Sequence, residues 1–305
     1  MAHTYIAGFD GSEASRAAVR LALRLGRAEG ARVIAARITP TVYSVPGRGA
    51  SPALDRSLDA DIRAQAEQEL RETLVVDGDV ERTVRSAHSP AEGLHALVEA
   101  EDAELLVVGV THHGPVGRLA PGSVAEHALH GSPCPVAVAP ADARGDSDAI
   151  GTVAVAYDRR EESEAALRTA KALAHRFGAT LVLITADDPR HYGQSVRAPL
   201  AELEAELRKQ LDVALARSAQ EIEGGLQVQT RVAIGPAGRA IVEACGDDID
   251  LLVMGSRAYG PLRSVLLGSV SRYVVDHATC PVIVVPRGAD TALEGQTTSA
   301  AMAGI

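Results

Sequence analysis

Tryptophan is absent from this chain of 305 residues, and phenylalanine occurs only twice. Ala, Val and Leu supply most of the 46% apolar share, so we expect a core of small aliphatic side chains. No apolar run reaches the about 18–20 residues that a membrane-spanning helix needs. Met1 to Phe9 also lacks the charged start and long apolar stretch of a secretory leader. These absences predict a globular, cytoplasmic protein.

Cysteine and basic charge are also scarce. Cys134, Cys245 and Cys280 stand singly and form no C-x-x-C pair, which suits a reducing compartment. The formal net charge is −10 and the sequence pI is near 5.5. Nucleic acids and anionic membranes bind basic surfaces, so this balance argues against both as partners.

Several catalytic and metal-binding motifs are missing. The sequence has no Gly-x-Ser-x-Gly elbow, no lysine-containing phosphate loop and no His-Glu-x-x-His helix. His112–His113 and the pair His127 and His130 have no further ligands at regular spacing, and the second half of the chain does not repeat them. A solvated or packing role for these histidines is therefore preferred over a metal site. The sequence predicts no catalytic residue and no bound structural metal.

The chain contains two copies of one unit. Four segments of the first half recur in the second half at offsets of 146 to 148 residues, which indicates a duplication. The matching segments are Ala7–Asp10 with Val155–Asp158, Leu105–Gly109 with Leu251–Gly255, Gly122–Val124 with Gly268–Val270, and Cys134–Val136 with Cys280–Val282.

Short aliphatic runs alternate with Ala- and charge-rich segments of helical periodicity in each copy. Such runs are typical of strands buried on both faces, and strands separated by helices predict right-handed βαβ units. Each copy is therefore predicted to be an α/β three-layer sandwich of the flavodoxin-like or nucleotide-binding class, with a five-stranded parallel sheet. The predicted strands are Thr4–Phe9, Arg32–Ile38, Glu81–Ser86, Leu105–Gly109 and Val136–Ala139, then Thr152–Tyr157, Thr180–Thr185, Gln227–Ala233, Leu251–Gly255 and Val282–Val285.

Composition also predicts the domain boundaries. One domain is expected over residues 1–140 and a second over residues 152–287. The polar segment Ala141–Gly151 is the predicted linker between them, and residues 288–305 form a predicted loose C-terminal tail.

Helices and one long loop are predicted within these domains. Ser12–Glu29 and Leu200–Gln220 have helical periodicity, the second with a solvated, charged face. Gly30 and Gly178 are predicted to end the first helix of each copy. Pro40–Leu54 contains proline and glycine and is predicted to be a loop.

Polar and glycine-rich segments follow the first and fourth strands, where open α/β sheets bind ligands. Asp10 and Asp158 follow the first strands, and each can either cap the next helix or accept a ligand hydrogen bond. After the fourth strands, Gly109–Ser123 and Gly255–Ser269 each lead into a helix whose exposed N–H groups form an anion site. An ordinary crossover loop is the alternative, but finding the pattern in both copies favours the anion site.

These residues resemble the universal stress protein family. Its pattern is Gly, two residues, Gly, nine residues and then Gly-Ser or Gly-Thr, with an Asp after the first strand and a closing Pro-Val strand. The resemblance covers essentially the whole chain and implies two tandem adenine-nucleotide α-hydrolase-like domains. It also implies that Pro135–Ala139 and Pro281–Val285 pair in an internal pseudo-dimer, with a homodimer of chains as a further possibility. The matching residues are Asp10, Gly109, Gly122 and Ser123, and Asp158, Gly255, Gly268 and Ser269.

The resemblance also implies a nucleotide-binding role for each matched residue. The pattern's second glycine is replaced by His112 in the first copy and Ala258 in the second, and the ring of His112 is the larger obstacle. We therefore rank the second site higher. The implied contacts are Asp10 and Asp158 to adenine or ribose, Ile38 and Ala186 to adenine, Gly109 and Gly255 to ribose, and Gly122, Ser123, Gly268, Ser269, Val270 and Ser271 around the phosphates.

The leading hypothesis is a tandem universal stress protein that binds an adenine nucleotide, ATP with Mg²⁺, for stress-response regulation. The nucleotide loops contain no lysine, so any catalysis would be slow ATP hydrolysis. The alternative is a protein-interaction module whose nucleotide sites have decayed at His112 and Ala258. A dedicated enzyme ranks third, because no general base or nucleophile is evident at the strand ends.

Overall fold

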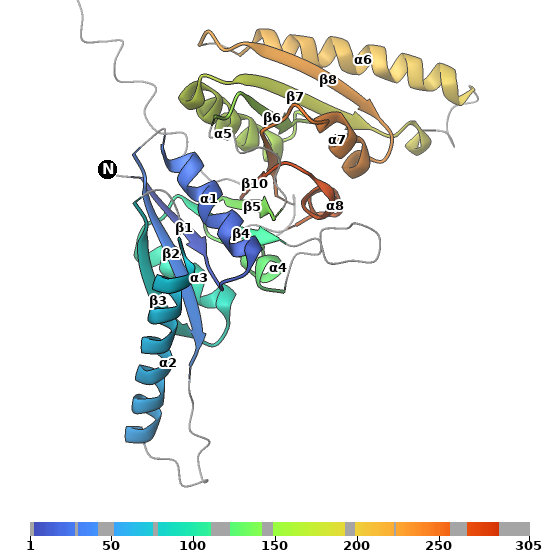
Figure 1. The fold of residues 1–305 in the computed structure, drawn as a ribbon. Helices are drawn as coiled ribbons and strands as arrows, with labels where there is room; N and C mark the ends of the chain where they lie inside the picture. The colour runs from blue at the N-terminus through green and yellow to red at the C-terminus, as the bar shows by residue number, and fades with distance from the viewer. Residues whose placement is uncertain are drawn as a thin grey trace, which may run out of the picture. The chain divides into compact units, whose positions relative to one another are not determined.

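The structure is a computed structural model that describes residues 3–27, 30–41, 52–75, 79–110, 123–141, 149–192, 199–222, 224–256 and 267–286. The chain divides into two compact units, Met1–Ala143 and Arg144–Ile305. Figure 1 shows the helices and strands of both units.

The first unit contains five parallel strands in the order β3-β2-β1-β4-β5. Helices connect them, and α3 packs against α4 on the sheet. Right-handed crossovers place α1 and α2 on one face and α3 and α4 on the other. The elements are β1 (Thr4–Gly8), α1 (Glu13–Arg27), β2 (Arg32–Pro40), α2 (Pro52–Thr73), β3 (Glu81–Ala87), α3 (Pro90–Ala100), β4 (Leu105–Val110), α4 (Ser123–Leu129) and β5 (Val136–Pro140).

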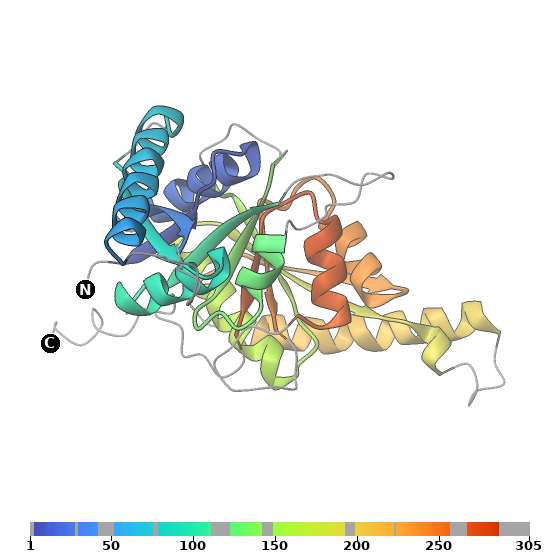
Figure 2. The ribbon, with the colours of Figure 1, turned by 90° about the horizontal axis from the view of Figure 1, so that it is seen from below.

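The second unit repeats this arrangement, with its strands in the order β10-β9-β6-β7-β8. Helix α7 packs against α8, which lies beside it in Figure 2. The long helix α6 packs on β8 and β7. The elements are β6 (Thr152–Ala156), α5 (Glu161–Phe177), β7 (Thr180–Asp187), a 3₁₀ turn η1 (Pro189–His191), α6 (Leu200–Gln220), β8 (Val228–Ile234), α7 (Ala237–Cys245), β9 (Leu251–Gly255), α8 (Ser269–His277) and β10 (Val282–Val285).

The central strands form the core of each unit. Leu106 and Val107 of β4 and Leu252 and Val253 of β9 are fully buried. Side chains from both faces of these strands are covered, which explains why their sequences are continuous aliphatic runs rather than alternating patterns.

The predicted α/β fold and its ten strands are confirmed. Strand ends shift slightly: β2 continues to Pro40 and β7 to Asp187, because both keep pairing with the neighbouring edge strand. Gly178 ends α5 as predicted, with φ 62° and its N–H donating to carbonyls of the last turn.

The predicted loop Pro40–Leu54 is wrong at both ends. Pro40 is the last residue of β2, and α2 already begins at Pro52. Proline suits the first turn of a helix, because the N–H that it lacks would have no partner there. Residues 42–51 of this segment lie outside the described part of the chain.

The domain boundaries, the pairing of the terminal strands and the C-terminal tail stay predictions. Residues 142–148 of the predicted linker and all of 288–305 lie outside the described part of the chain. Within that part, the structure has no helix with the length and apolar character required to cross a membrane.

Candidate functional site

The predicted site residues of each unit lie at the carboxyl ends of its parallel strands, which all point to the same side of the sheet. In the second unit, Asp158 follows β6, Ala186 lies near the end of β7, and Gly255 is the last residue of β9. The register pairs Ala156 with Ile184, so these strand ends are neighbours. Ser269 opens α8 at the same edge, after the predicted phosphate loop.

The first unit places its corresponding residues in the same way. Asp10 follows β1, Ile38 lies near the end of β2, and Gly109 lies near the end of β4. Gly122 lies outside the described residues, and Ser123 is described only as the first residue of α4.

Neither aspartate caps the next helix, which was one of the two predicted alternatives. The cap contact of α1 comes from Ser12, whose hydroxyl accepts a hydrogen bond from the N–H of Ser15, and Arg160 is the N-cap residue of α5. The aspartates instead hold the turns just before these caps. Oδ1 of Asp10 accepts a 2.9 Å hydrogen bond from the N–H of Ser12. Oδ1 of Asp158 accepts one of 3.1 Å from the N–H of Arg160, whose Nε lies 3.5 Å from Oδ2. The side chain of Asp158 is nevertheless half exposed, so it remains accessible at the edge of the sheet.

Asp10 is held in its charged form. Burial alone would raise its pKa, but hydrogen bonds from Ser12 and Ser15 and the charge of Arg37 outweigh that effect and hold the pKa below its ordinary value. Arg37 extends from β2 and lies 3.3 Å from Glu69 of α2. At the carboxyl ends of the strands in the first unit, the charge of Arg37 is therefore balanced by the nearby carboxylates of Asp10 and Glu69.

Two of the predicted site residues in the first unit have clear packing roles. A Cβ added to Gly109 would stand 1.9 Å from the carbonyl oxygen of Ala14, so the glycine lets α1 approach β4 closely. Ile38 packs against Gly93 of α3, where an added Cβ would stand 2.7 Å from its Cγ2. Packing of this kind explains both residues without a ligand, and their nucleotide contacts stay predictions.

The start of α8 is organised by Ser271. Its hydroxyl accepts a 2.9 Å hydrogen bond from the N–H of Gly268 and lies 3.3 Å from the carbonyl oxygen of the same residue. Ser271 is buried, whereas Ser269 at the first helical position is exposed. The N–H groups of a first helical turn have no partners within the helix, and the binding of an anion to them stays a prediction for this segment.

Sequence reasoning missed Ser256, which directly follows Gly255 at the end of β9. Its N–H donates to the carbonyl of Val285, but its hydroxyl is buried and has no hydrogen-bond partner among the residues that the structure describes. Only 6% of the residue is exposed. Buried hydroxyls in proteins are normally hydrogen-bonded, so an orphaned one at the edge of the sheet indicates a place for a polar partner.

The turn after β7 was also missed. The hydroxyl of Tyr192 donates a 2.9 Å hydrogen bond to Oδ2 of Asp187, and this carboxylate raises the pKa of the tyrosine. The charge of Arg160 acts on the same phenol in the opposite direction, so the turns after β6 and β7 lie within electrostatic reach of each other. A sequence signal existed, because the Asp188–Pro189 step is a typical start of a short helical turn.

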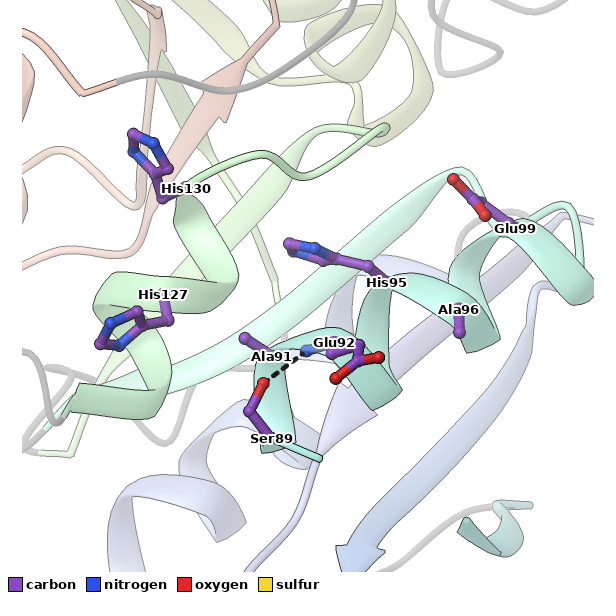
Figure 3. Close-up of a pocket in the computed structure, with 8 residues that line it drawn as sticks. All are labelled: Ser89, Ala91, Glu92, His95, Ala96, Glu99, His127 and His130. Atoms are coloured by element: carbon purple, nitrogen blue, oxygen red, sulfur yellow. Dashed lines mark hydrogen bonds between the residues drawn. The ribbon is translucent and has the colours of Figure 1, made fainter. Parts of the chain in front are cut away.

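A separate hollow of about 440 Å³ lies between α3 and α4 of the first unit (Figure 3). His95, His127 and His130 all line it, but their rings point in different directions in Figure 3. His95 is held by a 2.8 Å hydrogen bond between Nε2 and the carbonyl of Ala128. No metal-binding group of three side chains occurs among the described residues. The histidine spacing therefore gains no support as a metal site.

Comparisons with known proteins identify the family. The profile of the universal stress protein family matches residues 1–140 and again residues 150–286. The chain therefore belongs to the universal stress protein family and carries two such domains in tandem.

Similar proteins share this tandem length. A universal stress protein of Mycobacterium tuberculosis is 27% identical over 295 residues, covering 93% of this chain and 99% of the relative. One from Mycolicibacterium smegmatis is 29% identical over 287 residues, covering 92% and 96%. A crystal structure of a universal stress protein from Archaeoglobus fulgidus has a TM-score of 0.59 at 19% identity, covering 93% of this chain and 98% of that one. The structural likeness supports the fold.

Proposed function

We propose that the second unit binds an adenine nucleotide, ATP with Mg²⁺, and that the chain is a regulatory stress-response protein of the reducing cytoplasm. The observation that carries this proposal is the orphaned hydroxyl of Ser256 beside Gly255. A ribose hydroxyl or a phosphate oxygen supplies the hydrogen-bond partner that this buried group lacks.

Three neighbouring features fit the same ligand. The half-exposed carboxylate of Asp158 can accept a hydrogen bond from a ribose hydroxyl or an adenine amine. The start of α8 after Gly268 offers backbone N–H groups to phosphate oxygens. Ala186 leaves room beside β7 because its side chain is a single methyl group. When bound, Mg²⁺ would neutralise part of the phosphate charge.

The second unit fits this role better than the first. Ser256 corresponds to Val110 at the end of β4, which is buried and carries no hydrogen-bonding side chain. The second copy therefore has a polar group where the first has an aliphatic one. This difference supports the ranking of the two sites by a feature other than their loops.

Isothermal titration of the full chain with ATP and Mg²⁺ tests the proposal. We expect binding, and we expect Ser256→Val to weaken it about three- to tenfold, the loss of roughly one hydrogen bond. Thr169→Val is the matched control, because it removes a buried hydroxyl of α5 that donates to Ala165 within its own helix. No heat and no thermal shift at millimolar ATP would overturn the proposal. Equal affinities of wild type and Ser256→Val would overturn the role of Ser256.

A further inference from the structure

A second hollow in the second unit lies between the loop after β6 and one face of α6. Its volume is about 270 Å³. Arg159 lines it from the loop, and Lys209, Val213 and Arg217 line it from the helix. None of these residues belongs to the set proposed above for nucleotide binding.

Three of these lining residues are cations. Arg159, Lys209 and Arg217 are exposed, and the structure pairs none of them with a carboxylate among the residues that it describes. Glu206 is the one acid in the lining, and its carboxylate accepts a 2.8 Å hydrogen bond from Gln210. The hollow therefore carries a net positive charge on a chain whose formal net charge is −10.

Helix geometry lets these cations converge. Lys209 and Arg217 are eight residues apart, about 12 Å along the helix axis, and both have long side chains that can bend toward Val213 between them. Val213 is 49% exposed, so it forms an uncovered apolar floor. Arg159 closes the hollow from the opposite side.

The backbone of Arg159 is in a strained conformation. Its φ is 64°, a left-handed value that residues with a side chain rarely adopt. The corresponding residue of the first unit is Gly11, which takes φ 87° without that penalty. The second unit thus keeps an arginine at a position where glycine is the unstrained choice, and strain of this kind is typical of functional sites.

The first unit carries the opposite charge on the equivalent surface. The strand register shows which residues of the two units correspond. Ala36 pairs with Thr83 in the first unit, and Ile184 pairs with Arg231 in the second, so residues 148 positions apart correspond on both strands. The same offset therefore applies to α2 and α6, which connect these strands. Lys209 then corresponds to Asp61 and Arg217 to Glu69. The carboxylate of Glu69 lies 3.3 Å from Arg37, and the residue corresponding to Arg37 in the second unit is Thr185.

We infer that this hollow binds a small phosphate-bearing anion, of the pyrophosphate class, at Arg159, Lys209 and Arg217. Guanidinium groups donate paired hydrogen bonds to phosphate oxygens, and an ammonium group adds a mobile charge. The volume suits a small molecule rather than a protein segment. The inference does not depend on nucleotide binding at Ser256, because the two sets of residues are separate.

Amide NMR spectra of the ¹⁵N-labelled full chain, titrated with inorganic pyrophosphate at low ionic strength, test the site. We expect shifts at Arg159 and along residues 206–217, and weaker binding as salt is added. Lys209→Asp and Arg217→Glu install the first unit's residues and should each raise the dissociation constant at least about fivefold. Arg63→Glu, an exposed position of α2 with the same change in charge, should leave it unchanged.

Three outcomes would overturn the inference. Shifts confined to Gly268–Ser271 would assign the anion to the start of α8 instead. If Arg63→Glu and Lys209→Asp weakened pyrophosphate binding equally, the effect would come from the net charge of the protein and not from this hollow. A response to a polyglutamate peptide without a response to pyrophosphate would assign the surface to an acidic protein partner.

Discussion

Asp188 and Arg190 form a bidentate ion pair directly after β7, in which Nε and Nη2 of the arginine donate to the two carboxylate oxygens at 2.9 and 2.7 Å. The N–H of Arg190 adds a third hydrogen bond of 3.0 Å to Oδ1. The side chain of Asp188 is only 7% exposed. These contacts fix the turn that follows Ala186, so the edge of the proposed adenine pocket depends on a charged carboxylate.

This pair predicts a specific loss of stability in acid. The hydrogen bonds from Arg190 lower the pKa of Asp188 from 3.8 to about 2. Because the folded state holds the lower pKa, the stabilisation is complete above pH 3.8 and is lost as the pH falls toward 2. Asp188→Asn should therefore lower the urea midpoint at pH 6, and the difference from wild type should shrink between pH 4 and pH 2. A difference that stays constant over this range would contradict the assignment.

The contact between Gly109 and Ala14 predicts a large packing effect. Gly109→Ala places a methyl group 1.9 Å from a helix carbonyl, which neither element can avoid without moving. We expect the first unit to lose about 3 kcal/mol, the upper range for overpacking. Chemical denaturation monitored by circular dichroism measures this loss.

Gly151→Ala is the matched control for that variant. The nearest heavy atom to a Cβ at Gly151 is Oδ2 of Asp250 at 3.6 Å, an ordinary contact distance. Its stability should stay within about 1 kcal/mol of wild type. If Gly109→Ala were equally mild, the close approach of α1 to β4 would not explain the glycine.

The sequence patterns predicted the scaffold better than the site, for physical reasons. Strands such as Leu251–Gly255 are buried on both faces, so a continuous run of aliphatic residues predicts their position in the sequence. Whether the hydroxyl of Ser256 has a partner depends on which side chains surround it after folding. The residues next to it in the sequence do not predict those surroundings. The charged face of α6 was likewise interpreted as solvated, because Arg159, which completes the hollow, lies 50 residues before Lys209 in the chain.

The cysteines should be unreactive in the folded chain. Burial raises the pKa of the Cys134 thiol to about 12, and a hydrogen bond with Cys245 together with burial raises that of Cys280. Thiols react as thiolates, so Ellman's reagent at pH 8 should label neither residue until denaturant is added. After unfolding, three thiols per chain should react. Rapid labelling of Cys134 or Cys280 in the native protein would show that these strands open easily.

The two nucleotide sites should respond unequally to the same substitution. Gly268 is the N-cap of α8 with φ −79° and ψ 174°, and a branched side chain there would keep phosphate oxygens from the first-turn N–H groups. Gly268→Val should weaken ATP binding about tenfold or more, whereas Gly122→Val should have a smaller effect. Dissociation constants from titration calorimetry decide between them. Equal losses, or the reverse order, would overturn the ranking of the second site.

Replacing Arg159 should stabilise the second unit while removing a predicted ligand contact. Arg159→Gly releases the strain of φ 64°, and we expect a gain of about 1 kcal/mol in unfolding free energy. Arg160→Gly is the comparison variant, because Arg160 has φ −91° and no strain to release. It should lower the unfolding free energy, since glycine makes the unfolded chain more flexible and the ion pair with Asp158 is lost. The same Arg159→Gly variant should bind pyrophosphate more weakly than wild type. Greater stability with weaker anion binding would show that this residue is kept for its side chain, at a cost to the fold. A variant that is less stable than wild type would show instead that the arginine stabilises the turn.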